Sequence, residues 1–147
     1  MLSKYLTEKT ICFAKECENW EIAVWLSGKP LLDIGAVNDG YIDACIENVK
    51  KYGPYIVLAP LVAMPHAKAP EYINFDGISY LNLSKPVSVM NCQDRCARVF
   101  IMLATKKNEN HLEGLAALSE ILGDDVKRSS LINATCTADV LKTINGR

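Results

Sequence analysis

The chain has 147 residues, of which 50% are hydrophobic, and its 16 Lys and Arg residues against 17 Asp and Glu residues leave a formal net charge of -1. A chain of this length buries roughly 70% of its unfolded surface, so it can fold as one domain without disulfides or an obligatory metal. The balanced charge excludes the broad basic surface of a nucleic-acid-binding or membrane-surface protein, and no apolar run has the length of a membrane span or signal peptide. We therefore expect a cytoplasmic protein without direct membrane insertion.

The first elements along the chain are a short strand and a helix. Residues 10–14 have the apolar character of a strand. Asn19 is a good N-cap for a helix that continues through about Ser27. Gly28 and Pro30 are expected to stop this helix.

A clearer helix and an apolar strand come next. Asn38 is a candidate N-cap for a helix whose apolar residues recur with a 3.6-residue period until Gly53. The continuous apolar run 55–58 lies between Pro54 and Pro60. Such a run predicts a strand that is covered on both faces of a sheet.

The second half repeats the alternation of strands and helices. Residues 77–83 and 97–104 predict two strands, the latter apolar enough to be central. Three helices are expected to begin at the caps Asn110 (with Glu113 completing a capping box), Asp124 and Thr137. The alternation predicts a layered α/β domain with a mainly buried sheet.

Six cysteines invite a metal or disulfide interpretation, which their spacing does not support. No pair has CxxC spacing and none precedes a histidine pair, so we expect reduced thiols and no metal site. Cys12 and Cys45 lie among apolar neighbours and should pack as small hydrophobic residues. Cys92 lies in a polar stretch and is a weaker candidate for an exposed thiol.

One of the two histidines, His66, follows an apolar strand within a segment rich in proline. Prolines 60, 65 and 70 fix the backbone and remove donors, so a rigid, non-helical loop is expected at the end of the sheet. The small residues Ala63 and Ala67 would leave room for a partner surface. An ordinary loop histidine bonded to a carbonyl is an equally good interpretation of these residues alone.

The other histidine, His111, directly follows the expected N-cap Asn110. Free N–H groups and the positive end of the helix dipole disfavour an imidazolium there and favour an anion such as a phosphoryl oxygen. A surface histidine in a first helical turn is the alternative. The pair becomes informative because no other strong nucleophile candidate is present.

Several blocks together resemble a known family. The stretch 55–67, ending in Pro65-His66-Ala67, resembles the phosphorylation-site motif of the mannitol/fructose class of enzyme IIA proteins in the bacterial phosphoenolpyruvate-dependent sugar phosphotransferase system. The upstream blocks 19–23, 28–33, 35–37 and 41–44 resemble the ascorbate-type branch, and the similarity extends over essentially the whole chain. The resemblance implies a single enzyme IIA domain over residues 1–147, an α/β layered sandwich with a mixed, mostly buried β-sheet and helices on both faces.

The resemblance also implies a phosphotransferase with a phosphohistidine intermediate. His66 would accept a phosphoryl group from the phosphocarrier HPr and pass it to a cysteine of enzyme IIB, for L-ascorbate uptake through the membrane component IIC. His111 would stabilise the phosphoryl group. No cofactor or nucleic acid is implied, and the oligomeric state stays open, with a homodimer as one option.

Two further sets of residues are candidates for binding. Mannitol-type members carry an arginine sixteen residues before the active histidine, and that position is Lys50 here, which keeps the charge but loses the planar fork. Equally available cations, better interpreted as solvated surface residues, are Lys51, Lys68, Lys106 and Lys107. Candidates for an apolar docking surface, with core burial as the alternative, are Leu61, Val62 and Met64.

Two other functions remain open at this point. A phosphorylatable regulator outside transport would use the same histidine. A Cys-dependent hydrolase would pair Cys92 or Cys96 with His66 or His111.

Overall fold

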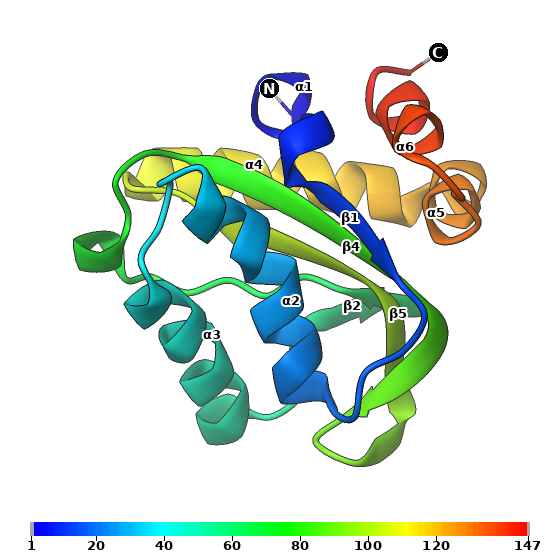
Figure 1. The fold of residues 1–147 in the computed structure, drawn as a ribbon, viewed down its shortest axis with the longest axis horizontal. Coiled ribbons are helices and arrows are strands. Elements are labelled where there is room, and N and C mark those ends of the chain that lie inside the picture. The colour runs from blue at the N-terminus through cyan, green and yellow to red at the C-terminus, as the bar shows by residue number, and fades with distance from the viewer. Residues whose placement is uncertain (1, 147) are drawn as a thin grey trace.

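A mixed five-stranded sheet lies between two layers of helices in the computed structural model, which describes residues 2–146 (Figure 1). In chain order the elements are α1 (Leu2–Tyr5), the 3-10 helix η1 (Glu8–Thr10), β1 (Ile11–Ala14), α2 (Trp20–Asp33), α3 (Asp39–Tyr52), β2 (Val57–Ala59), β3 (Leu61–Ala63), η2 (Pro70–Tyr72), β4 (Gly77–Val89), β5 (Cys92–Ala104), α4 (Asn108–Gly123), α5 (Asp125–Ile132) and α6 (Thr137–Ile144). The expected α/β class is confirmed.

The strand order in the sheet is β1-β4-β5-β3-β2. β1 pairs with β4 and β3 pairs with β5 in parallel, whereas β4–β5 and β2–β3 are antiparallel. β5 is therefore central, and its end at Ala104 lies beside the segment that follows β3. This pairing places the segment containing His66 next to the end of the most buried strand.

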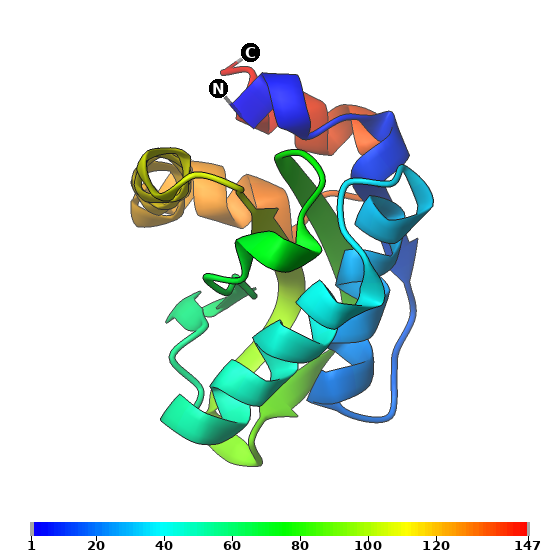
Figure 2. The same ribbon diagram turned by 90° about the vertical axis from the view of Figure 1, so that its left-hand side faces the viewer.

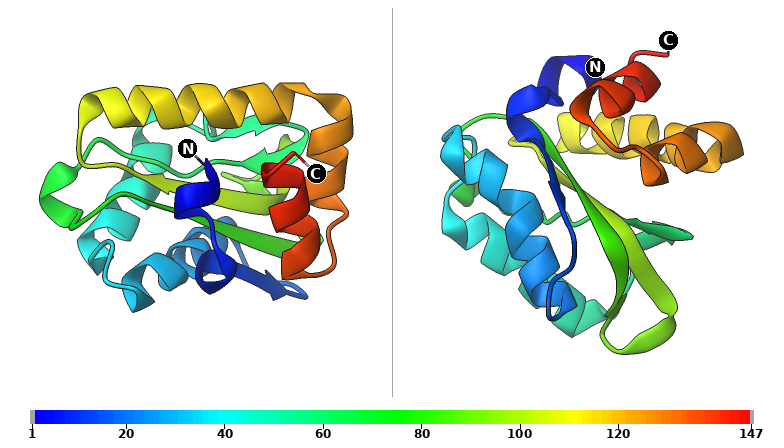
Figure 3. Two further views of the ribbon diagram at one scale, coloured as in Figure 1. Left: turned by 90° about the horizontal axis from the view of Figure 1, so that it is seen from above. Right: turned by 45° about the vertical axis from the view of Figure 1, so that its right-hand side comes forward.

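The helices cover both faces of the sheet, as expected. α2 and α3 pack on one face and form one hydrophobic core with it (Figure 2). α1, α4, α5 and α6 pack on the other face and form a second core (Figure 3). The helices thus enclose residues 77–83 of β4 and 97–104 of β5, which explains the nearly continuous apolar sequence of this part of β5.

Several expected helix limits are confirmed. α3 ends at Tyr52, and Gly53 follows it with a positive φ of 92°. The side chain of Asp124 accepts hydrogen bonds from the N–H groups of Val126 and Lys127, as an N-cap of α5 should. α6 begins at Thr137, with Cys136 rather than Thr137 as its N-cap, and buries Val140.

The prediction that the first long helix stops near Ser27 is wrong, because α2 continues through Pro30 to Asp33. A Cβ on Gly28 would lie 2.7 Å from the Ile42 side chain, so this glycine permits close packing of α2 on α3 rather than ending the helix. Pro30 removes one helical hydrogen bond, but Leu31 beyond it is fully buried. Burial of a leucine stabilises by about 1.5–3 kcal/mol, enough to offset much of the local cost.

The prediction of a strand at 55–58 covered on both faces is also wrong. β2 is a short edge strand, and its Leu58 is 46% exposed. Residues 61–63, expected in a loop, form β3 inside the sheet. The chain reverses at Pro60 and Leu61, where Pro60 cannot donate to a ladder and Leu61 has a φ of 66°.

The second half does not alternate strand and helix throughout, because β4 and β5 form one long antiparallel hairpin. Its turn contains Met90 and Asn91, both with a positive φ near 58°, which matches the twist that tight hairpin turns require. The strands extend beyond the predicted limits through polar, exposed residues such as 84–86 and 93–95. These residues project past the helices, so their sequence lacks the apolar pattern of the core.

Candidate active site

The backbone around His66 is tied to the end of β5. The N–H of Leu103 donates to the carbonyl of Pro65 at 3.1 Å, and His66 forms an isolated parallel bridge with Leu103. The hydroxyl of Tyr41, fully buried on α3, donates to the carbonyl of Leu103 and accepts from the N–H of Ala67 at 3.1 Å. The loop is thus rigid for a reason beyond its prolines.

The His66 ring has one nitrogen fixed and one free. Its Nδ1 lies 2.7 Å from the carbonyl oxygen of Met64. Because a carbonyl only accepts, Nδ1 carries the hydrogen and Nε2 keeps its lone pair. The half-buried ring meets the edge of the Tyr55 ring at 5.5 Å and 89°.

Burial lowers the pKa of His66 below its usual value, although the hydrogen bond to Met64 acts in the opposite direction. The neutral ring is therefore the dominant form at neutral pH. A neutral imidazole with a free Nε2 is a nucleophile.

His111 is brought next to His66, with ring centroids 5.5 Å apart and a tilt of 48°. Its Nδ1 lies 3.1 Å from Oγ1 of Thr105, the residue that follows β5. The side chain is buried, and the pKa of His111 is lowered by burial first and then by the charges of His66 and Lys68. Two residues far apart in sequence thus form one pair of neutral rings.

The expected cap of the helix that carries His111 is wrong. α4 begins at Asn108 with Lys107 as its N-cap, and the N–H of His111 already donates to the carbonyl of Lys107. Asn110 lies within the first turn and donates to Asp76, whose other carboxylate oxygen accepts from the N–H of Lys106 at 2.8 Å. Asp76 therefore anchors the start of α4, and Asn110 and Glu113 form no capping box.

Three of the candidate lysines line a small hollow of about 160 Å³ beside His111. They are Lys68, Lys106 and Lys107. Nζ of Lys106 donates to the carbonyl of Ile73 at 3.1 Å, whereas Lys68 is exposed next to the histidine pair. Cations at this position would favour an anion in the hollow.

Lys50 and Lys51 lie elsewhere. Nζ of Lys50 is 3.6 Å from a Glu21 oxygen and 3.7 Å from a Glu47 oxygen, on the groove between α2 and α3. Nζ of Lys51 lies over the Tyr52 ring. The structure therefore does not place Lys50 in the hollow beside the histidines.

Two of the three expected docking residues are not accessible. Val62 and Met64 are fully buried on the sheet, so the alternative of core burial is correct for them, and only Leu61 is partly exposed. The small residues Ala63 and Ala67 are buried as well. They are buried because the chain around them forms β3 and continues beside β5, an arrangement that the proline-rich sequence does not indicate.

Sequence reasoning missed the accessible apolar residues at the pair. Tyr55 is 36% exposed and touches the His66 ring, and Leu112 is 56% exposed beside His111 in sequence. It also missed the positioning groups Tyr41 and Thr105. Tyr41 falls within the apolar periodicity of its helix and within the block 41–44, neither of which signals a role for its hydroxyl, and the position of Thr105 directly after a central strand is the one available signal.

The thiols of the hydrolase alternative lie at the far end of β5. Cys96 is seven positions before Leu103, the residue bridged to His66, which is roughly 23 Å along a strand. Cys92 is farther still. Since a nucleophile and its base need hydrogen-bond contact, the Cys–His hydrolase interpretation is wrong.

Burial raises the pKa of Cys12 to about 11 and that of Cys45 to about 12, so both thiols stay protonated at neutral pH.

Across residues 2–146, each helix is too short or too polar to cross a membrane. Within the same residues, no three His, Cys, Asp or Glu side chains are grouped so that they could hold a metal ion.

Comparison with known proteins gives a consistent result. Residues 4–146 match the family model for the EIIA 2 component of the phosphoenolpyruvate-dependent sugar phosphotransferase system. The chain is 31% identical to the mannitol-specific cryptic phosphotransferase enzyme IIA component of Escherichia coli K12, over 91% of this chain and 90% of that protein. It is 28% identical to the ascorbate-specific EIIA component of the same strain, over 93% and 90% of the two chains.

Solved structures agree with the fold. The solution structure of the cryptic mannitol enzyme IIA CmtB from Escherichia coli superposes with a TM-score of 0.89, at 29% identity and 99% coverage of both chains. In the complex of enzyme IIA and phosphorylated enzyme IIB for mannitol from Escherichia coli, the matched chain gives a TM-score of 0.81 at 23% identity, covering 95% of this chain and 96% of that one.

Proposed function

The chain belongs to the EIIA 2 family of the sugar phosphotransferase system, and from this premise we propose that His66 accepts a phosphoryl group from the phosphocarrier HPr and passes it to a cysteine of an enzyme IIB. The observation that carries the proposal is the geometry of the two rings. Nδ1 of His66 is bonded to a carbonyl, Nε2 is free, and His111 lies against the ring. Residues 1–147 would act as one domain in this relay.

The transfer needs little covalent machinery. The Nε2 lone pair of His66 attacks phosphorus, an N–P bond forms, and the N–P bond to the histidine of HPr breaks, returning its electron pair to that ring. In the second step the thiolate of enzyme IIB attacks phosphorus and Nε2 of His66 recovers its lone pair. Nδ1 keeps its hydrogen and donates it to the carbonyl of Met64 throughout. Such transfers depend mainly on alignment and on stabilising charge at three equatorial oxygens.

His111 and Lys68 supply that stabilisation. When the hydroxyl of Thr105 donates to Nδ1 of His111, Nε2 of His111 carries the hydrogen and can donate to a phosphoryl oxygen. Lys68 adds a positive charge whose effect is already visible in the lowered pKa of His111.

The partners follow from the same site. A related enzyme IIA forms a complex with phosphorylated enzyme IIB, which supports an enzyme IIB partner here, with an indirect link to the IIC permease. Exposed Tyr55, which contacts the His66 ring, and exposed Leu112, which follows His111 in sequence, replace Val62 and Met64 as proposed docking residues. Similarity to the ascorbate-specific EIIA component, together with the upstream sequence blocks, supports L-ascorbate as the transported substrate.

The test is incubation with phosphoenolpyruvate, enzyme I and HPr, followed by mass mapping. We expect one acid-labile phosphoryl group, on His66, and none in His66→Ala. Label on a Ser or Asp, or label that persists in His66→Ala, would contradict the proposal. The HPr step should also proceed in excess EDTA once enzyme I has been removed.

A regulator outside transport would be phosphorylated equally well, so the acceptor distinguishes the two roles. Rapid transfer to an enzyme IIB from the same organism supports transport. Phosphorylation without transfer to any IIB favours regulation.

A further inference from the structure

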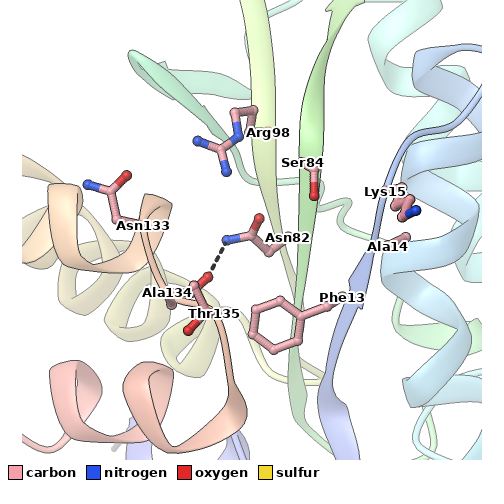
Figure 4. Close-up of a pocket in the computed structure, with 9 residues that line it drawn as sticks. All are labelled: Phe13, Ala14, Lys15, Asn82, Ser84, Arg98, Asn133, Ala134 and Thr135. Carbon is pink, nitrogen blue, oxygen red and sulfur yellow. Dashed lines mark hydrogen bonds between the residues drawn. The ribbon is translucent and has the colours of Figure 1, made fainter.

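A larger hollow, of about 450 Å³, lies at the β1 edge of the sheet (Figure 4). It is bordered by the end of β1, the β4–β5 hairpin and the connection between α5 and α6. The residues that line it include Phe13, Lys15, Asn82, Ser84, Arg98 and Thr135. Arg98 is five positions before Leu103 on β5, roughly 16 Å along the strand from the bridge to His66, so this hollow is separate from the histidine pair.

The guanidinium of Arg98 is fixed at one nitrogen and open at the others. The pairing of β4 and β5 shifts register after Asn82, and Nε of Arg98 donates to the carbonyl of Leu83 at this irregularity, at 2.9 Å. Figure 4 shows the two remaining nitrogens directed into the hollow, toward Asn82 and Asn133. Among the described residues, no carboxylate forms an ion pair with Arg98. A fork of this kind is suited to a phosphate or a carboxylate.

Asn82 presents a solvent-accessible acceptor to the same space. Its side chain is 4% exposed, and Nδ2 donates to the Tyr80 hydroxyl at 2.8 Å and to the carbonyl of Ile132 at 3.1 Å. Since all partners of Nδ2 accept, the orientation of the amide is fixed, and Oδ1 lies on the other side, toward Arg98 (Figure 4). Within residues 2–146 no hydrogen-bond donor reaches Oδ1, so a ligand hydroxyl would satisfy it.

The rest of the lining gives the hollow a positive charge and one apolar wall. Lys15 is exposed at its rim, and no Asp or Glu lines it. The nearby carboxylate of Asp139 is occupied by the N–H and hydroxyl of Thr135, at 3.0 and 3.1 Å. The ring of Phe13 is 39% exposed and packs edge-on against Tyr80, 5.9 Å away.

We propose that this hollow binds a phosphorylated sugar. The phosphate would lie on the two open nitrogens of Arg98, with Lys15 adding positive charge from the rim beyond β1, a sugar hydroxyl would donate to Oδ1 of Asn82, and the C–H face of the sugar ring would pack on Phe13 (Figure 4). Two cations without a lining carboxylate match a phosphate monoester, which carries close to two negative charges at neutral pH, better than a singly charged carboxylate. The site needs no chemistry at His66 and does not rest on the proposed relay.

The first experiment uses glucose 6-phosphate as the probe, with glucose and inorganic phosphate as separate arms, and follows backbone amide NMR signals. We expect saturable shifts centred on residues 13–15, 82–84, 98 and 133–135. Glucose should not bind, and inorganic phosphate should bind at least about tenfold more weakly, since the hydroxyl and ring contacts are missing. Equal binding of inorganic phosphate, shifts centred on His66 and His111, or no saturable binding at millimolar glucose 6-phosphate would overturn the proposal.

Variants then test the named contacts. Arg98→Gln should weaken binding of glucose 6-phosphate about tenfold or more, the loss expected for a charge-assisted fork. Arg95→Gln is the matched control, because Arg95 lies on the same strand but lines another hollow. Lys15→Gln, an exposed position with little influence on folding, should weaken binding at least about threefold. This variant keeps the test available if Arg98→Gln is unstable because it loses the hydrogen bond to Leu83.

Unchanged affinity in both Arg98→Gln and Lys15→Gln would overturn the assignment of the phosphate. His66→Ala should bind glucose 6-phosphate as the parent chain does. A failure of the relay and a failure of this site are therefore seen in different measurements.

Discussion

His66 is held through backbone groups, whereas His111 is held through a side-chain hydroxyl. The carbonyl of Met64 can only accept, so the hydrogen of His66 is fixed on Nδ1. The hydroxyl of Thr105 can donate or accept, so the hydrogen of His111 can occupy either nitrogen. A ring that must present a lone pair at one nitrogen is best held by a group that can only accept a hydrogen bond. A ring that must adjust to charge arriving beside it is better held by a hydroxyl, which can donate or accept.

The largest expected effect comes from removing the ring of His111, whose hydrogen can occupy either nitrogen. His111→Ala should leave His66 phosphorylated but slow single-turnover transfer to enzyme IIB by about 10²–10³, the usual loss for one donor to a transition state. Because His111 is buried, this variant also leaves a gap, so thermal melting is measured alongside. His111→Gln, which retains an amide donor, should recover part of the rate; an unchanged rate in His111→Ala would make the residue a bystander.

Removing the anchor of the loop that carries His66 should mainly lower the free energy of unfolding. Tyr41→Phe leaves the carbonyl of Leu103 and the N–H of Ala67 without their buried partner, which should lower the free energy of unfolding by about 2–4 kcal/mol. Chemical denaturation measures the change, and phosphorylation of His66 should slow. Tyr55→Phe is the control, because the Tyr55 hydroxyl is exposed and its hydrogen bond to the carbonyl of His66 is long, at 3.4 Å. Equal effects of the two variants would refute the anchoring role of Tyr41.

A smaller effect is expected when the hydroxyl of Thr105 is removed. Thr105→Val retains shape but cannot bond Nδ1 of His111, so transfer to enzyme IIB should fall about tenfold, the equivalent of one hydrogen bond of about 1.4 kcal/mol. Thr105→Ser should keep the rate. A rate that is the same in the valine and serine variants would mean that the hydroxyl does not set the hydrogen of His111.

The smallest effect is a pH dependence shared by both rings. Burial lowers the pKa of His66 and that of His111 in the folded chain. Between these lowered values and about 6.5, the unfolded chain binds more protons than the folded one, so stability should fall as the pH decreases through about 6.5 and level off below the folded pKa values. Melting temperatures across pH 5–8 measure it. A double variant, His66→Asn with His111→Gln, should flatten the profile, and an unchanged profile would contradict the buried neutral rings.

The two histidines could be chosen from sequence, but their pairing could not. His66 was identified by its proline-rich segment and family motif, and His111 by its position near a helix start. Their contact depends on β3 lying beside β5, a strand order that periodicity does not contain. The same order decides that Val62 and Met64 are core residues, and that Lys68 rather than Lys50 lies beside the pair.

Helix limits failed where tertiary contacts outweighed local signals. Gly28 and Pro30 are stop signals in any isolated helix, yet packing of α2 on α3 carries the helix past them. Asn110 is a better N-cap by type than Lys107, but Asp76 from the loop before β4 binds both the Asn110 amide and the Lys106 backbone. Such a contact between distant residues leaves no trace in a local window of sequence.

The hydroxyl of Tyr41 reaches across 62 residues to Leu103 and across 26 to Ala67. A contact of this kind has a high contact order, and it forms only after the intervening chain has been closed into a loop. During synthesis, a ribosome that has released His66 has not yet released β5, so the histidine emerges long before its ring can be aligned. If His66 accepts phosphate as proposed, its competence to do so coincides with completion of the native topology, and incomplete or misfolded chains are not expected to take phosphoryl groups from the carrier.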